Sequence, residues 1–488
     1  MFARRLLSIV IAIGLVVLLS SCVTPGHRER IAAAERVDQF LRNGVDHGFS
    51  GAVLVAVDGQ IVLNQGYGWA VKDDATPFTP DTVFSIGSVT KQFTATAILL
   101  LSEQSSLSLE DPITRFFTDV PVDKRDITLH QLLTHSSGLP HDIGSDFEQT
   151  STEAYFATLL QQPLLFEPGV KHNYSNAGYS ILARVVELTS GQDYEAFLAK
   201  HLFGPAGMTQ TGYFLPTWHD ANLSHGYTRN IFDRGSMIHR FREDGLVSWH
   251  LKGNGGIHST QNDMYRWYMA LVTNTILSPA LTRQLTTPYI VEAAGGDSYY
   301  AYGWAIFSSD RDTRIVSHNG GNGAYFHDFL WLPEDDAVII FSTNAASRQV
   351  ELAWTIEKML FDPVFVPKPV KKNVYQFVLD FTSEQSISEA PTLASMLRAD
   401  YRREIADPDT LNRLGYRLLE SGSEQNNRWA LNLFALNMTL FPEMPNVWDS
   451  LGDGYLAIGE TELAIGAYDA AVRLGMSDSK EKIDALKH

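Results

Sequence analysis

The 488-residue sequence contains only one cysteine, Cys22, so the chain cannot form an internal disulfide bond. Clusters of lysine and arginine are also lacking, and the formal net charge is −18. Because nucleic-acid binding depends on concentrated positive charge, this composition argues against a nucleic-acid partner. Charged residues make up 19% of the chain and hydrophobic residues 44%, which excludes a mostly disordered protein.

The apolar stretch near the N-terminus, residues 6–19, is shorter than the roughly 20 residues of a membrane-spanning helix. It follows two arginines and precedes two serines and Cys22, an order typical of a secretory signal peptide. Residues 19–22 also look like a bacterial lipobox, in which the cysteine carries the lipid after cleavage. We therefore predict a lipoprotein signal peptide over residues 1–21, lipidation of Cys22 and a tether over residues 22–30. An ordinary cleaved signal and an uncleaved anchor remain alternatives.

Residues 31–361 hold a pattern of strands at both ends and helices between them. An Asp-Gly pair separates the first two β-rich runs, which is a strong hairpin signal. The predicted elements are a helix over residues 30–45, a hairpin of strands 52–57 and 61–67, an apolar helix over 88–103, a second hairpin of strands 324–332 and 337–343, and a helix over 345–360. This order predicts an α+β fold, with an antiparallel sheet flanked by helices and a helical subdomain.

Residues 362–372 contain three prolines and three lysines, a composition that favours an extended linker. We place a domain boundary there. The remaining residues, 373–488, are predicted to form an all-α tail.

The tail contains about two segments that resemble tetratricopeptide repeats. The clearer one has the matching residues Trp448, Leu451, Gly452, Tyr455, Ala464, Tyr468 and Ala471. The looser one fits only if about three extra residues lie in its inter-helix turn, and its matching residues are Leu414, Gly415, Leu418, Ala430, Phe434 and Pro442. Because two repeats are few for a stable array, we expect this tail to pack against a protein partner or the preceding domain. A plain helical cap is the alternative.

The pattern Ser-x-x-Lys occurs at Ser88, Ser477 and Ser479, so the motif alone is weak evidence. The last two copies lie in a charged stretch that we interpret as a solvated helix end. Ser88 instead opens a long apolar helix, with Lys91 one turn later on the same face. A lysine activates a serine nucleophile only if burial or nearby positive charge lowers its pKa, and the apolar surroundings favour burial.

Two further motifs carry polar groups suited to acyl transfer. Tyr174 and Asn176 form the only Tyr-x-Asn in the chain, in which the tyrosine could relay a proton and the asparagine could bond a substrate carbonyl and the lysine. His318, Gly320 and Gly321 end a strand-like run, where glycines let a substrate approach a backbone N–H. Taken singly, each motif is more often an ordinary turn or loop.

The order Ser-x-x-Lys, Tyr-x-Asn, His-x-Gly resembles the serine hydrolase superfamily of class C β-lactamases, penicillin-binding proteins, D-alanyl-D-alanine carboxypeptidases and related esterases. Residues 127–138, the Gly-Asn-Gly-Gly at 253–256 and the Tyr-Gly-Trp at 302–304 also look like parts of this family. The resemblance covers about residues 37–361. It implies an acyl-serine intermediate, no cofactor, and a small-molecule or peptidoglycan-derived substrate at the bacterial envelope.

The resemblance also implies a role for each motif residue. Ser88 is acylated, and Lys91 and Tyr174 move the proton. Substrate-binding groups are Asn176, His318 and Gly320, and the oxyanion hole consists of the backbone N–H groups of Ser88 and Gly321. Many β-lactamases carry lysine where this chain has histidine, which lowers the expectation of efficient β-lactam hydrolysis.

Two other interpretations compete with the enzyme. His130, His135 and His141 suggest a metal site, but their spacing is poor and we predict none. The fold could also serve as a binding module for peptidoglycan fragments or a protein partner, with negligible turnover. Labelling of Ser88 by a fluorescent penicillin or a fluorophosphonate would separate the enzyme from the binding module, because a binding module should stay unlabelled.

Overall fold

The computed structural model describes residues 25–346 and 351–487, so the predicted signal peptide and Cys22 lie outside the described residues. The chain divides into two compact units. Unit 1 holds Phe232–Lys371 and the described residues before Arg229, and unit 2 holds Lys372–His488 with Arg229–Ile231. None of the described helices is both long enough and apolar enough to cross a membrane.

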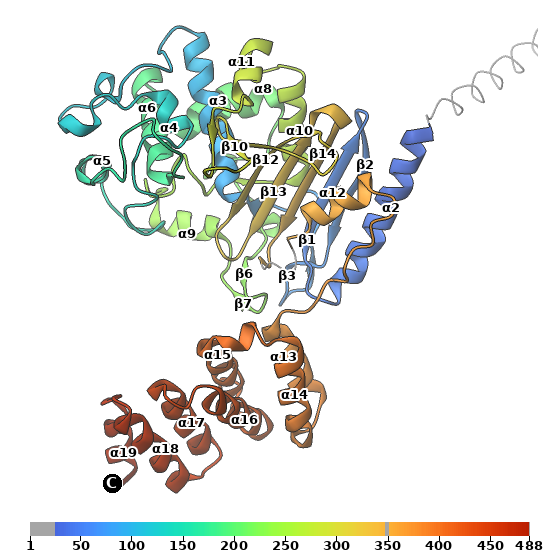
Figure 1. The fold of residues 1–488 in the computed structure, drawn as a ribbon, viewed down its shortest axis with the longest axis vertical. Helices are drawn as coiled ribbons and strands as arrows, with labels where there is room; N and C mark the ends of the chain where they lie inside the picture. The colour runs from blue at the N-terminus through green and yellow to red at the C-terminus, as the bar shows by residue number, and fades with distance from the viewer. Residues whose placement is uncertain (1–24, 347–350, 488) are drawn as a thin grey trace, which may run out of the picture. The chain divides into compact units, whose positions relative to one another are not determined.

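An antiparallel sheet of eight strands forms the centre of unit 1 (Figure 1). In spatial order its strands are β2 (Gln60–Tyr67), β1 (Gly51–Val57), β14 (Ala337–Thr343), β13 (Phe326–Leu332), β12 (Arg314–Gly321), β11 (Ala305–Ser308), β10 (Tyr299–Tyr300) and β9 (Ile290–Val291). Three two-stranded pairs complete the strands: β3 (Trp69–Val71) with β4 (Thr76–Pro77), β5 (Phe84–Ser85) with β8 (His258–Ser259), and β6 (Tyr227–Thr228) with β7 (Phe232–Asp233).

Both predicted hairpins are present. Asp58 and Gly59 have φ values of 53° and 70°, the left-handed conformation that a tight two-residue turn between β1 and β2 requires. Strand β1 also pairs with β14, from Gly51 opposite Thr343 to Val57 opposite Ala337. Strands from the two ends of the unit therefore lie next to each other in one sheet.

Each face of the sheet carries its own hydrophobic core. Alternate residues of β1, such as Val53 and Val55, pack with the helices α2 and α12, whereas Ala52 and Leu54 face α3, α6 and α10. Strand β1 is buried along its whole length because helices cover both faces. This arrangement confirms the predicted α+β fold.

Eleven helices are described in unit 1: α2 (Pro25–Val45), α3 (Thr90–Glu103), α4 (Leu129–Leu133), α5 (Thr152–Gln161), α6 (Asn176–Ser190), α7 (Tyr194–Leu198), α8 (Gly204–Ala206), α9 (Met237–Asp244), α10 (Gln261–Val272), α11 (Pro279–Leu285) and α12 (Ala353–Phe361). The prediction of a helix from residue 345 was wrong, because α12 begins at Ala353. The Asn344 side chain donates to the carbonyl oxygens of Trp69 and His225, at 3.0 and 2.9 Å, and the described residues 344–346 are not helical.

Unit 2 is all-α, as the tail was predicted to be. Its helices are α13 (Val374–Glu384), α14 (Ala390–Asp400), α15 (Pro408–Leu419), α16 (Glu424–Leu440), α17 (Pro445–Ala457), α18 (Thr461–Arg473) and α19 (Ser479–Lys487). A Cβ atom on Gly415 would lie 2.3 Å from the Phe434 ring, and one on Gly452 would lie 2.4 Å from the Tyr468 ring. Each of the pairs α15–α16 and α17–α18 thus contains the same kind of contact, in which a glycine of the first helix packs against an aromatic ring of the second.

The extra residues of the first pair do not lie where they were predicted. They lengthen the start of α16, in which Phe434 follows the first residue, Glu424, by ten positions. In α18 Tyr468 follows Thr461 by only seven positions. The turns before the two helices, residues 420–423 and 458–460, differ by a single residue.

Candidate active site

Ser88 lies at the entrance to α3, in a 3-10 turn over Gly87–Val89. The regular helix begins at Thr90, slightly later than predicted. Lys91 occupies the first turn of α3 and has no exposed surface. Its Nζ donates a hydrogen bond to Ser88 Oγ at 3.2 Å, so the structure brings the predicted nucleophile and its lysine together.

The other partners of Lys91 are neutral oxygens. Its Nζ lies 2.7 Å from Asn176 Oδ1 and 2.7 Å from the carbonyl oxygen of Asn254. Burial lowers the Lys91 pKa well below its ordinary value, and Asp142 and Asp146 oppose this shift only from a distance. A lysine in these surroundings is poised to be an uncharged amine that accepts a proton.

Tyr174 and Asn176 reach the lysine from the start of α6. Ser175 caps this helix, because its Oγ accepts a hydrogen bond from Gly178 N at 3.0 Å. The Tyr174 ring lies 4.7 Å from Lys91 Nζ. Burial raises the pKa of Tyr174, and a hydrogen bond with Ser88 counteracts only part of this rise. The tyrosine is therefore a phenol that can donate a proton.

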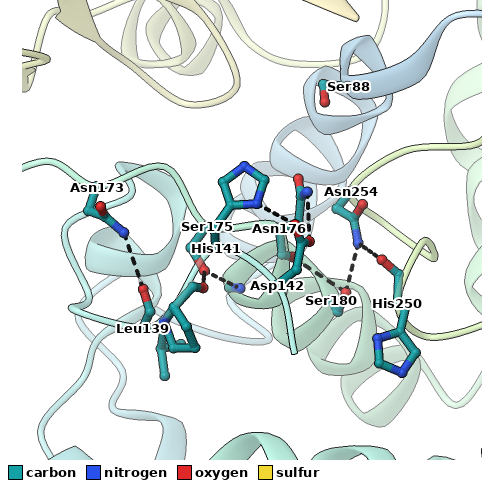
Figure 2. Close-up of polar contacts among 12 residues, drawn as sticks. Ser88, Leu139, His141, Asp142, Asn173, Ser175, Asn176, Ser180, His250 and Asn254 are labelled. Carbon is teal, nitrogen blue, oxygen red and sulfur yellow. Dashed lines mark hydrogen bonds and ion pairs between the residues drawn. The ribbon is translucent and has the colours of Figure 1, made fainter. Parts of the chain in front are cut away.

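The Asn176 amide is held from both sides. Its Oδ1 faces Lys91, and its Nδ2 donates to Asp142 Oδ1 at 2.9 Å (Figure 2). An amide nitrogen has two hydrogens, so Asn176 can hold Asp142 with one and bond a substrate carbonyl with the other. The Asn254 amide in turn donates to Ser180 Oγ and the His250 carbonyl, at 3.0 and 2.9 Å, which fixes the backbone oxygen that Lys91 uses.

His318 in β12 is almost fully buried, with 6% of its surface exposed. Its Nδ1 lies 2.6 Å from the carbonyl oxygen of Asn319 and must carry the hydrogen. Its Nε2 then accepts from the Tyr300 hydroxyl at 3.0 Å. Burial, with a smaller contribution from the charge of Lys91, lowers the His318 pKa to about 3. The ring is therefore neutral at physiological pH.

The two glycines of β12 pack directly against the nucleophile turn. A Cβ atom on Gly320 would lie 2.6 Å from Ser88 N, and one on Gly87 would lie 2.6 Å from Gly321 N. The pairing of β12 with β11 ends at Ser317, before these glycines. The two predicted oxyanion donors thus lie in adjoining backbone segments that no side chain can separate.

The three histidines considered as metal ligands have protein partners. His130 Nδ1 lies 2.8 Å from the Tyr302 hydroxyl, and His141 bonds to Asp142. His135 Nδ1 accepts from Ser175 N at 3.0 Å, and its ring centre lies 4.2 Å from that of Tyr174. His135 is a structural hydrogen-bonder that holds the Tyr-x-Asn segment.

Sequence reasoning missed three contributors: Asp142, Asn254 and Tyr300. Asn254 lies between glycines with φ values of 82° at Gly253 and 79° at Gly256, and this unusual glycine run was the available signal. Asp142 and Tyr300 had no comparable signal, because each reaches the site through contacts between residues distant in the chain.

The Beta-lactamase family model matches residues 37–358, about two thirds of the chain. The chain belongs to the beta-lactamase family. This member of a serine hydrolase family is 30% identical to penicillin-binding protein 4* of Bacillus subtilis (strain 168) over 320 residues, covering 62% of this chain and 70% of that protein. It is also 30% identical to the putative penicillin-binding protein PbpX of the same organism over 278 residues, covering 57% and 67%.

Solved structures agree with this family. The penicillin-binding protein from Bacillus halodurans matches with a TM-score of 0.57 and 26% identity, covering 67% of this chain and 100% of that one. The octameric penicillin-binding protein homologue from Pyrococcus abyssi matches with a TM-score of 0.58 and 23% identity, covering 72% and 82%. The second likeness concerns the fold alone. Together the comparisons confirm the predicted superfamily.

Proposed function

We propose that unit 1 hydrolyses an ester or amide through an acyl-enzyme at Ser88. The observation that carries this proposal is the buried Lys91, which lies 3.2 Å from Ser88 Oγ and whose other polar partners are neutral oxygens. An uncharged amine in this position removes the serine proton, whereas a charged one cannot.

The proposed reaction uses the remaining groups in order. Lys91 takes the proton of Ser88 as Oγ attacks the substrate carbonyl, and the N–H groups of Ser88 and Gly321 stabilise the oxyanion. Tyr174 donates its proton to the leaving group and regains one from the Lys91 ammonium. A water molecule then attacks the acyl-serine, and its proton passes to the neutral Lys91. The Lys91 ammonium returns this proton to Ser88 Oγ as the ester bond to the serine breaks, which restores the starting state.

The neutral His318 selects the substrate class in this proposal. A D-alanyl-D-alanine peptide and a β-lactam carry a carboxylate close to the reacting carbonyl, and a neutral imidazole that already bonds Tyr300 and Asn319 offers it no cation. We therefore expect esters to be better substrates than either of these.

The test measures turnover and intact mass of the purified protein with p-nitrophenyl butyrate, nitrocefin and a D-alanyl-D-alanine peptide. We expect an acyl adduct on the wild type and no adduct on Ser88→Ala, with the ester turned over fastest. Ser479→Ala is the matched control and should behave like the wild type. An adduct that persists in Ser88→Ala, or none in the wild type, would contradict the proposal and favour the binding module.

The cellular location is part of the same proposal. The signal-like residues 1–21 and Cys22 support export to the cell envelope with a lipid anchor. The tail remains a candidate site for a protein partner. Mass spectrometry of the N-terminal peptide from the expressed protein would detect the lipid on Cys22, and an unmodified cysteine would contradict this location.

A further inference from the structure

A cavity of about 490 Å³ lies in unit 1. Its walls come from the loop that contains Asp146, the segment around Arg234, helix α9, and the turn between β12 and β13. The volume is within the range of small-molecule sites.

The cavity adjoins the site at two points. Asn322, in its wall, directly follows the proposed oxyanion residue Gly321. Asp146, which also lines the cavity, is near enough for its charge to influence the Lys91 ammonium. A substrate whose carbonyl lies at Ser88 therefore has space to extend into this cavity.

One wall is fixed before any ligand binds. Asn322 Oδ1 accepts hydrogen bonds from Ala324 N at 3.1 Å and Tyr325 N at 2.8 Å, and its Nδ2 lies 2.8 Å from Met237 Sδ. The buried Tyr325 donates to the carbonyl oxygen of Ser224 at 2.6 Å. The turn thus presents a rigid, partly apolar surface.

Two arginines bring positive charge to the cavity. Arg234 Nε donates to Thr228 Oγ1 and Arg240 Nε donates to Asp244 Oδ2, each at 2.9 Å. Within residues 25–346 and 351–487, the terminal Nη groups of both arginines have no hydrogen-bond or ion-pair partner. The Arg240 side chain is 51% exposed, so a ligand can reach it. Paired N–H donors of this kind bind carboxylates in a bidentate manner.

We propose that this cavity is a substrate subsite in which Arg234 and Arg240 bind a carboxylate remote from the reacting carbonyl. The proposal rests on the proposed function at Ser88. The apolar parts of Met237, Phe147 and Tyr325 accommodate the chain that joins the two groups. In this proposal a carboxylate far from the reacting carbonyl is bound by the two arginines. A carboxylate next to the reacting carbonyl lies instead against the neutral His318, which offers it no positive charge.

The test compares kcat/KM for p-nitrophenyl butyrate with that for p-nitrophenyl esters whose acyl chains of increasing length end in a carboxylate. A second series carries the carboxylate on the phenol side. We expect the double variant Arg234→Gln/Arg240→Gln to lose about tenfold to a hundredfold on the preferred charged ester, the effect of losing charge-assisted hydrogen bonds. The kcat/KM of this double variant for p-nitrophenyl butyrate should change by less than about twofold.

Two controls make the result specific. Arg242→Gln is the same substitution on the same helix, but Arg242 bonds Asp220 and the Trp218 carbonyl and does not line the cavity. It should leave the ratio of charged to neutral ester unchanged. Asp146→Asn removes the negative charge of the cavity and should raise this ratio, while any effect through Lys91 cancels between the two esters.

Failure of the proposed subsite and failure of the proposed function give different results. If Ser88-dependent hydrolysis of butyrate persists but neither charged series shows an arginine-dependent preference, the subsite is overturned and the proposed function stands. If no ester shows Ser88-dependent hydrolysis, the proposed function itself fails. Circular dichroism and butyrate turnover of each variant exclude misfolding as the cause.

Discussion

The chain places Ser-x-x-Lys in two different surroundings, one in each unit. In both, a tyrosine ring lies near the lysine, 4.7 Å from Lys91 Nζ for Tyr174 and 5.1 Å from Lys482 Nζ for Tyr468. Lys91 bonds only neutral oxygens, whereas Lys482 Nζ lies 2.8 Å from carboxylate oxygens of both Asp449 and Asp453. The pKa falls at Lys91 through burial and rises at Lys482 because the two aspartates outweigh its burial.

The serines differ in the same way. Ser479 Oγ donates to Asp449 at 2.6 Å and has no exposed surface, while Ser88 is partly exposed and faces its lysine. The interpretation as a solvated helix end was wrong for Ser479 and Lys482, which belong to a partly buried ionic network, whereas Ser477 and Lys480 are exposed. The comparison shows that the charge on neighbouring oxygens, and not the motif, distinguishes the proposed nucleophile Ser88 from the structural Ser479.

The largest expected effect comes from removing the lysine at each site. Lys91→Met should lower kcat/KM for p-nitrophenyl butyrate by about 10⁴-fold, the upper range for a lost general base. Lys482→Met should change it by less than about twofold, because it lies in the other unit. Lys482→Met should instead lower the melting temperature of the protein, measured by circular dichroism. Equal activity of the two variants would remove the distinction between the sites.

The paired tyrosines sharpen the comparison. Tyr174→Phe should lower kcat by about a hundredfold, because the leaving group loses its proton donor. Tyr468→Phe removes a hydrogen bond to Asp453 Oδ1 at 2.7 Å and should leave kcat unchanged. Steady-state kinetics with ethyl butyrate, whose alkoxide leaving group needs a proton, measure both. Near-normal kcat for Tyr174→Phe would refute the proton relay.

A third variant makes the catalytic lysine resemble the structural one. Asn176→Asp places a carboxylate at the position 2.7 Å from Lys91 Nζ and should raise the lysine pKa. The neutral amine is then scarce at pH 7, so activity should fall by about tenfold to a hundredfold there and recover as the pH rises. A pH profile of kcat/KM tests the sign, since a purely steric effect would not recover in alkali.

The smallest expected effect is a shift of the acidic limb of the pH profile of kcat/KM in the Asp146→Asn variant. Asp146 raises the Lys91 pKa from a distance, so its removal should lower that pKa further. The wild type loses activity as the pH falls through the Lys91 pKa, and this limb should move to lower pH in the variant. An opposite shift in the pH profile would show that another group controls this limb.

Much of the fold was readable from local signals. The Asp-Gly turn identified the first hairpin, the β-rich runs on either side of residues 333–336 identified the second, and the three motifs identified the family. The start of α12 was not readable, because Asn344 is held by carbonyl groups more than a hundred residues away. Asp142 and Tyr300 reach the site through contacts with residues distant in the chain, so their residue types alone did not identify them. For Asn254 the glycine run at 253–256 was visible in the sequence, but the role of its backbone oxygen as a partner of Lys91 was not.

The close packing of Gly87 and Gly320 has a consequence for how the enzyme meets inhibitors. Because the backbone around Ser88 N and Gly321 N is already assembled by contacts in the core, a tetrahedral mimic such as a boronate pays little reorganisation energy on binding. Any alanine at either glycine would push the two segments apart. Affinity for such a mimic therefore reports the width of the gap between these segments, even in a variant whose proton relay has been disabled.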